Sequence, residues 1–235
     1  MKALFATLLF FVAASAVADP KVDRNALLLP TYIFEQQPPI SAGFAFIFEE
    51  AGQRYVATAF HVFGPPGGMR VPLSAREIPD EVKALAGLCL GDSKTVVVAQ
   101  PSLLIEDARA VDAKGGEADL TLFRMPDARA KAALTLAAAP PKIGAPVWIL
   151  TRLFDRPEAR LYPAKVIEST PKLLRYRFED GSLNLRACSG APLVDEAGAV
   201  VGMHLGFGTK ADVVEGAGLP VTALREKLAA ATKDE

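Results

Sequence analysis

Several residue types that mark particular classes of protein are scarce in this 235-residue chain. It has only two histidines, His61 and His204, and neither lies in a spacing typical of metal ligands, so we expect no metal site. It has no glycine-rich phosphate loop followed by a helix, so we expect no nucleotide cofactor. Lysine and arginine are scattered and the net charge is −1, which argues against binding to nucleic acid.

Long apolar runs are also missing after the N-terminus, so no later segment is expected to span a bilayer. The first 18 residues combine Lys2, an apolar Leu/Phe core and the small-x-small sequence Ala16-Val17-Ala18. This pattern predicts a signal peptide over 1–18, cleaved before Asp19. An uncleaved membrane anchor is the alternative, although the run is short for one. We therefore expect a periplasmic or secreted protein with no stable membrane insertion after cleavage.

Cysteine is represented only by Cys89 and Cys188. Export permits a disulfide, but two cysteines far apart in sequence do not specify one. We favour two buried thiols, because free cysteine packs as a small hydrophobic residue. Cys188 is adjacent to Ser189 and is an alternative nucleophile, but an exported thiol is vulnerable to oxidation.

The rest of the chain alternates short strand-like runs with turn residues, in two sets. This pattern predicts an all-β protein built from a pair of antiparallel barrels or sandwiches, followed by a C-terminal helix with apolar residues at helical spacing. The predicted segments are an N-terminal arm over 19–41, a first barrel over 42–130, a linker over 131–144, and a second barrel with the helix over 145–235.

One serine, Ser189, lies among small residues just before an apolar strand. A nucleophilic serine needs a base, and histidine is suited to that role near neutral pH. His204 follows on the next strand but has no obvious carboxylate partner, whereas His61 can have one. Asp119 enters a strongly apolar strand, and a buried carboxylate must be hydrogen-bonded. A histidine N–H is a suitable partner, so the sequence predicts a catalytic set of His61, Asp119 and Ser189.

Three segments carry these residues in that order: TAFHV, ADLTLFRM and CSGAPLVDEAGAVVGMHLG. They resemble the signature segments of the chymotrypsin-like (trypsin-fold) serine peptidases, especially the short bacterial members, from about Ala42 to the C-terminal helix. The resemblance implies two antiparallel six-stranded β-barrels, with His61 and Asp119 from the first and Ser189 from the second. It also implies an oxyanion hole made by the N–H groups of Ala187 and Ser189. The expected activity is that of a monomeric serine endopeptidase acting on polypeptides without a cofactor.

The sequence departs from the family pattern close to the serine. Ala187 stands where the family normally has glycine; if that position needs a positive φ, alanine adds about 1 kcal/mol of strain or misdirects the N–H. Phe60 and Ala191 replace smaller residues, and Cys188 replaces an acid. The alternative function is therefore a catalytically inactive or very slow trypsin-fold protein that acts as a binding module. A third hypothesis is an accessory barrel that docks on a larger assembly.

The resemblance places Leu183, His204, Leu205 and Gly206 around the substrate pocket. Leu183 lies near the position of the acid in trypsins, so a basic residue before the cleaved bond is disfavoured. His204 matches a pocket histidine of glutamate-specific bacterial relatives, which makes a preference for Glu or Asp conceivable. A small or apolar preference and a purely structural His204, satisfied by a backbone carbonyl, remain open.

Overall fold

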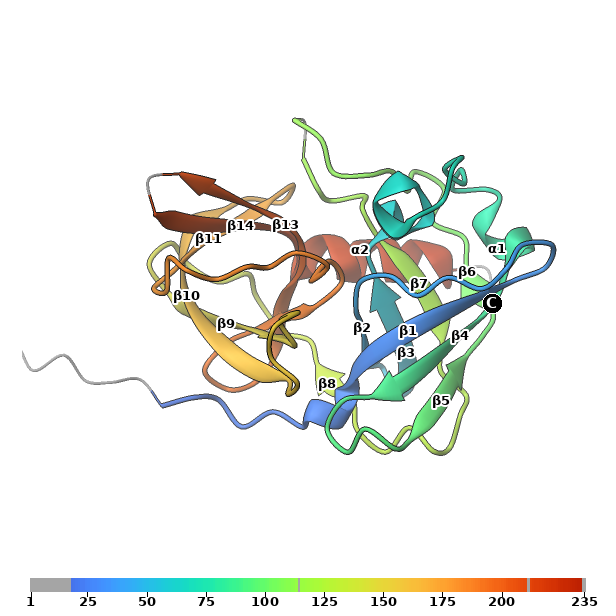
Figure 1. Ribbon diagram of the computed structural model, residues 1–235, viewed down its shortest axis with the longest axis horizontal. Helices are drawn as coiled ribbons and strands as arrows, with labels where there is room; N and C mark the ends of the chain where they lie inside the picture. Colours follow the sequence, from blue (N-terminus) through green and yellow to red (C-terminus); the bar gives the residue numbers. More distant parts are fainter. Residues whose placement is uncertain (1–17, 114, 211, 234–235) are drawn as a thin grey trace, which may run out of the picture.

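The computed structural model describes residues 18–113, 115–210 and 212–233. The signal peptide predicted over 1–18 therefore lies outside the described residues, apart from Ala18. Two lobes of β-strands lie side by side, and helix α2 (Val221–Ala231) runs behind them (Figure 1). No helix in the described part of the chain is long and apolar enough to cross a membrane.

The second lobe is a closed six-stranded barrel, as predicted. Its strands follow the order β10-β11-β14-β13-β12-β9, and β9 and β10 close the ring. Alternating burial along β11, with Leu174, Tyr176 and Phe178 inside, shows how the apolar pattern selects the inner face. The strands are β9 (Pro146–Thr151), β10 (Arg160–Ser169), β11 (Leu174–Phe178), β12 (Pro192–Val194), β13 (Val200–Lys210) and β14 (Val213–Pro220).

The first lobe is an open sheet, so the prediction of two closed six-stranded barrels is wrong for this half. The strand order is β5-β4-β1-β2-β3-β7-β6, with β8 paired to β2. The two edge strands, β5 and β6, are consecutive in the chain and only Gln100 and Pro101 separate them. Both strands are short. The two edges of the sheet are joined through this bend of the chain, and in the described residues no hydrogen-bonded ladder pairs β5 with β6. The strands are β1 (Leu27–Phe34), β2 (Ala45–Glu50), β3 (Gln53–Thr58), β4 (Val82–Cys89), β5 (Val96–Ala99), β6 (Ser102–Leu103), β7 (Thr121–Arg124) and β8 (Leu134–Thr135).

Strand β1 corrects the interpretation of 19–41 as an arm. It pairs with β2 and along most of its length with β4, and Leu27, Leu28 and Tyr32 are fully buried. Pro30 sits inside the strand, where a proline is normally found only at sheet edges or bulges, and this hid the strand in the sequence. The segment LLLPTYIF forms a strand because the free energy gained by burying its apolar side chains exceeds the cost of the one backbone donor that proline lacks.

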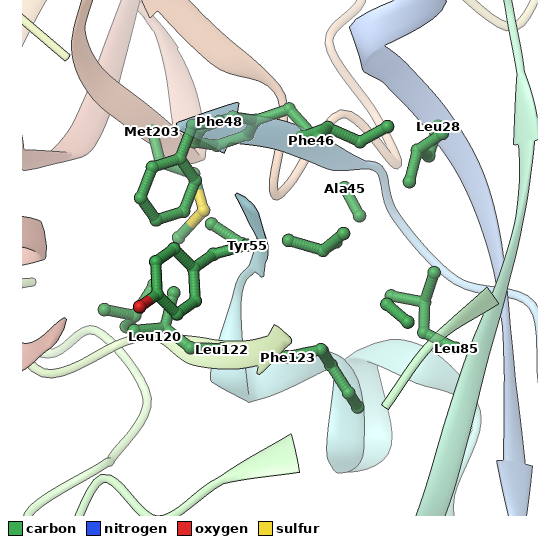
Figure 2. Close-up of a cluster of buried hydrophobic side chains, with 14 of the residues drawn as sticks. Leu28, Ala45, Phe46, Phe48, Tyr55, Leu85, Leu120, Leu122, Phe123 and Met203 are labelled. Atoms are coloured by element: carbon green, nitrogen blue, oxygen red, sulfur yellow. The ribbon is translucent and has the colours of Figure 1, made fainter. Parts of the chain in front are cut away.

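The hydrophobic core of the first lobe continues into the second. Figure 2 shows Phe46, Phe48 and Tyr55 together with Met203, which comes from β13. Helix α2 adds Leu224 and Leu228 to the same core. The two lobes are therefore held in a fixed relation by shared apolar burial.

Helix α2 also carries ion pairs from the second lobe to the first. Arg225 contacts Glu50 at 2.6 Å, and Lys227 contacts Asp107 at 2.6 Å. The remaining helical segments are single turns: η1 (Arg24–Ala26), η2 (Phe60–Phe63), η3 (Pro65–Gly67) and α1 (Ile78–Glu81). The η2 turn matters most, because it carries His61.

Candidate active site

His61 is positioned by the end of an apolar strand. Strand β3 ends at Thr58, and the chain then forms the η2 turn over Phe60–Phe63 before Gly64 and Pro65 redirect it. Both neighbours of His61 in this turn, Phe60 and Val62, are buried, while the imidazole is half-buried. The packing of its neighbours thus fixes the turn and leaves the ring at the rim of the lobe.

Asp119 is fully buried directly beside that ring. Its Oδ2 lies 2.7 Å from Nδ1 of His61 and accepts the backbone N–H of Val111 at 2.9 Å. Its Oδ1 accepts the backbone N–H of His61, also at 2.9 Å. Three donors thereby compensate for the burial of one carboxylate. Because Nδ1 faces a carboxylate, it is the donor nitrogen of this contact, and Nε2 is the nitrogen that can serve as a base.

Ser189 lies in the loop that leads into β12 and is held between the two lobes. Its carbonyl oxygen accepts the N–H of Phe44 at 2.7 Å, from the chain just before β2. Its hydroxyl donates to the carbonyl oxygen of Leu205 on β13 at 3.0 Å. Among the described residues no hydrogen bond joins this hydroxyl to His61.

Contacts of neighbouring glycines show that the segments carrying the three predicted residues pack against one another. A Cβ added to Gly190 would lie 3.1 Å from Oγ1 of Thr58, the last residue of the strand that leads to His61. A Cβ added to Gly116, three positions before Asp119, would lie 2.7 Å from Cδ1 of Leu205. The serine loop therefore packs against the strand end that carries the histidine, and β13 packs against the segment that carries the aspartate.

The backbone at Ala187 has the left-handed conformation that strains any residue with a side chain. Its φ is +62°, and Gly190 follows with a φ of +88°. In the described part of the chain, the N–H groups of Ala187 and Ser189 have no hydrogen-bond partner. Two unpaired N–H groups beside a serine hydroxyl can bind an oxyanion. Because Ala187 has a Cβ, it adopts this left-handed conformation at a cost in backbone strain.

Cys188 is a poor candidate nucleophile. The side chain is 1% exposed and packs into the core of the second lobe. Burial raises the pKa of its thiol to about 11, so the thiol stays protonated near neutral pH. Cys89 is also a buried free thiol, in the core of the first lobe.

The predicted pocket residues divide into a buried and an accessible group. Leu183, His204 and Leu205 are buried, whereas Gly206 lines a surface cavity at the edge of β13. Nδ1 of His204 is hydrogen-bonded to the hydroxyl of Tyr176 at 2.5 Å, rather than to a backbone carbonyl. Burial, reinforced by nearby His61, lowers the pKa of His204 to about 3, so the ring is neutral.

Some residues that complete this site were not singled out in the sequence. Val111 contributes only its backbone N–H, and no sequence pattern marks such a donor. Tyr176 belongs to a strand with plain alternation, and its partner His204 is distant in sequence. Gly43 and Phe44, which contact the serine carbonyl, lie before a strand whose sequence signals only a structural role.

Comparison with known proteins supports this fold assignment. The solved structure of a thermostable serine protease, AL20, from an extremophilic microorganism superposes with a TM-score of 0.59 at 14% identity, covering 91% of this chain and 99% of that one. The Rv3671c protease in its inactive form gives 0.58 at 18% identity, covering 92% and 99%. The active form of Rv3671c from M. tuberculosis gives 0.57 at 17% identity, covering 96% and 95%. No curated protein matches the sequence.

A match to a family of known sequences is more specific than these structural likenesses. Residues 43–203 match the trypsin-like peptidase domain, which is more than half of the chain. The matched region contains the His61–Asp119 pair and the Ser189 loop. The chain therefore belongs to the trypsin-like peptidase family, and the solved structures that it resembles are serine proteases.

Proposed function

We propose that this chain is an exported serine endopeptidase that cleaves polypeptides through His61, Asp119 and Ser189. The observation that carries the proposal is the buried carboxylate of Asp119, 2.7 Å from Nδ1 of His61. That contact orients the ring and stabilises the imidazolium that forms when Nε2 accepts a proton. The signal-peptide-like sequence before Asp19 supports export.

The proposed reaction begins with rotation of the Ser189 hydroxyl away from the Leu205 carbonyl and toward Nε2 of His61. The serine Oγ then attacks the scissile carbonyl carbon while His61 takes its proton. The N–H groups of Ala187 and Ser189 hold the negative oxygen of the tetrahedral intermediate. His61 passes the proton to the leaving amine, which departs and leaves the acyl-enzyme. Water then attacks the acyl carbon while His61 takes its proton, and His61 returns that proton to the serine Oγ as the acid product leaves.

One observation favours the second candidate, a non-catalytic binding module. The hydroxyl of Ser189 is engaged with Leu205, not His61. Catalytic hydrogen bonds are often formed only when substrate is bound, so the two functions are separated by a reagent that reports the nucleophilicity of the serine.

The deciding experiment is labelling with a fluorescent fluorophosphonate. We expect the purified chain lacking residues 1–18 to be labelled on Ser189, as located by mass spectrometry of the modified peptide. Labelling should be abolished in Ser189→Ala and strongly reduced in His61→Ala, because the first lacks the nucleophile and the second its base. Absence of labelling in the folded wild-type protein would support the binding module instead.

The residue at position 187 gives a separate prediction. We expect Ala187→Gly to leave the free energy of unfolding within about 1 kcal/mol of wild type, because relief of strain at φ +62° is offset by the greater backbone entropy of glycine. The labelling rate should be equal or higher, since glycine keeps the same N–H. Ala187→Val, with a branched side chain at the same φ, should be destabilised further. Urea unfolding and labelling kinetics measure both effects, and a tenfold slower Gly variant would contradict the oxyanion role.

A further inference from the structure

A second surface cavity lies beside the loop that carries Ser189, and no residue of β13 lines it. It has a volume of about 600 Å³, and its lining includes Ala187 of the proposed oxyanion hole and Gly43, which contacts the Ser189 carbonyl. The opposite wall is the loop between β9 and β10, which contains Phe154. Phe154 is 94% exposed, although a phenyl ring is normally buried.

The cavity carries an excess of positive charge. Arg152, Arg156 and Arg186 line it, against the single acid Asp155. No ion pair joins any of the three guanidinium groups to a carboxylate within the described part of the chain. Many other arginines do have such a partner: Arg54, Arg109, Arg129, Arg160, Arg175, Arg177 and Arg225. In a chain of net charge −1, three arginines without a carboxylate partner among the described residues give this cavity a local excess of positive charge, which favours anions.

The position of the cavity defines which part of a substrate would enter it. The cavity at the edge of β13 and this one have no lining residue in common, so a polypeptide lying across Ser189 with one end at the edge of β13 can place its other end here. The predicted pocket for the residue before the scissile bond is at Leu205 and Gly206. The residues that follow the scissile bond therefore lead past Ala187 into the cavity.

We infer that this cavity binds a carboxylate in the leaving-group segment of the substrate. Arg152, Arg156 and Arg186 would contact Asp or Glu within about three positions after the cleaved bond, because an extended chain advances about 3.3 Å per residue. The ring of Phe154 offers an apolar face to the stems of these side chains. The inference rests on the proposed endopeptidase function and adds a substrate class to it: polypeptides that are acidic on the leaving-group side.

A library of proteome-derived peptides tests the inference directly. Mass spectrometry of the products should show Asp and Glu enriched in the first three positions after the cut. In the triple variant R152Q/R156Q/R186Q we expect this enrichment to fall about tenfold, as the sum of three partly exposed charge contacts. The charge-reversed variant R152E/R156E should instead favour Lys and Arg at those positions. Arg186 is unchanged in this variant, and we expect the reversal in its presence. Arg76→Gln, at an exposed arginine that does not line the cavity, is the matched control.

The same digest separates the two sources of a carboxylate. Cuts spread along the peptides and followed by Asp or Glu indicate side chains, as we infer. Cuts clustered a fixed distance from peptide C-termini indicate that the cavity binds the terminal carboxylate, which would overturn the side-chain assignment. An unchanged residue profile in the triple variant would overturn the role of the cavity, while fluorophosphonate labelling would still support the endopeptidase.

A binding measurement decides the inference even if no cleavage is found. Fluorescence anisotropy with Ser189→Ala compares a labelled alanine-rich peptide containing Asp-Glu-Asp with its Asn-Gln-Asn counterpart. We expect the acidic peptide to bind about tenfold more tightly at low salt and the difference to shrink in 0.5 M NaCl, where exposed charges are screened. Equal affinities for the two peptides, or a preference that persists in the triple variant, would contradict the inference.

Discussion

Replacing Asp119 by asparagine is expected to slow fluorophosphonate labelling of Ser189 by about 10⁴-fold, the magnitude known for the equivalent change in a Ser-His-Asp template. The substitution keeps the shape of the side chain but removes its charge. Asp119 is fully buried, so its interaction with a protonated His61 is poorly screened by water. Loss of that charge removes the stabilisation of the imidazolium that forms during attack.

The hydrogen bonds around Asp119 leave no satisfactory orientation for an amide. If the NH₂ group takes the place of Oδ2, it faces the N–H of Val111 and forces the proton of His61 onto Nε2, which abolishes the base. If it takes the place of Oδ1, it faces the backbone N–H of His61. Either orientation sets two donors against each other in a buried site, so a fall in stability of about 1–3 kcal/mol accompanies the loss of activity.

Asp127→Asn is the matched control for this prediction. Asp127 is another carboxylate of the first lobe that accepts a backbone N–H, from Val98 at 2.9 Å, but it pairs with Arg129 rather than a histidine. We expect this variant to lose stability and to keep its labelling rate. If Asp119→Asn labels within tenfold of wild type while Ser189→Ala is unlabelled, the orienting role of Asp119 is wrong.

The contact between His61 and Asp119 could be predicted because the sequence leaves little choice. Only two histidines exist, and only one acid enters a strongly apolar strand where it needs a donor. The second lobe could likewise be predicted from alternating strands such as β11. In both cases the residue types that favour the local structure are also those that the tertiary contacts require.

The features that escaped prediction depend on contacts between distant segments. Strand β1 was hidden by Pro30, whose cost is outweighed by burial against β4, a partner that the local pattern does not reveal. The open first sheet depends on how two short edge strands meet at Gln100 and Pro101. The arginine-lined cavity gathers Arg152 and Arg186 from loops on either side of two intervening strands. No periodicity or motif records such an assembly.

Gly190→Ala is expected to lower the free energy of unfolding by about 3 kcal/mol, from the strain of a positive φ and from a steric clash. The new Cβ would lie 2.0 Å from the carbonyl oxygen of Phe44, which is backbone and cannot swing away. Because about 1 kcal/mol corresponds to 2–4 °C in a chain of this size, thermal unfolding should shift by roughly 10 °C.

The same clash should inactivate the protein that remains folded. The N–H of Gly190 donates to the carbonyl of His204 at 2.8 Å, and the adjacent Ser189 carbonyl accepts from Phe44, so relief of the clash must move the serine. A displacement near 1 Å lowers a rate by about 100-fold, which labelling kinetics will measure.

Gly52→Ala separates the two causes, since Gly52 has a φ of +74° but no atom lies within 4 Å of the position that a Cβ would occupy. That variant should lose only about 1 kcal/mol and label normally. Equal losses in both variants would show that backbone strain alone, and not the close approach of the two lobes at Ser189, makes glycine necessary at position 190.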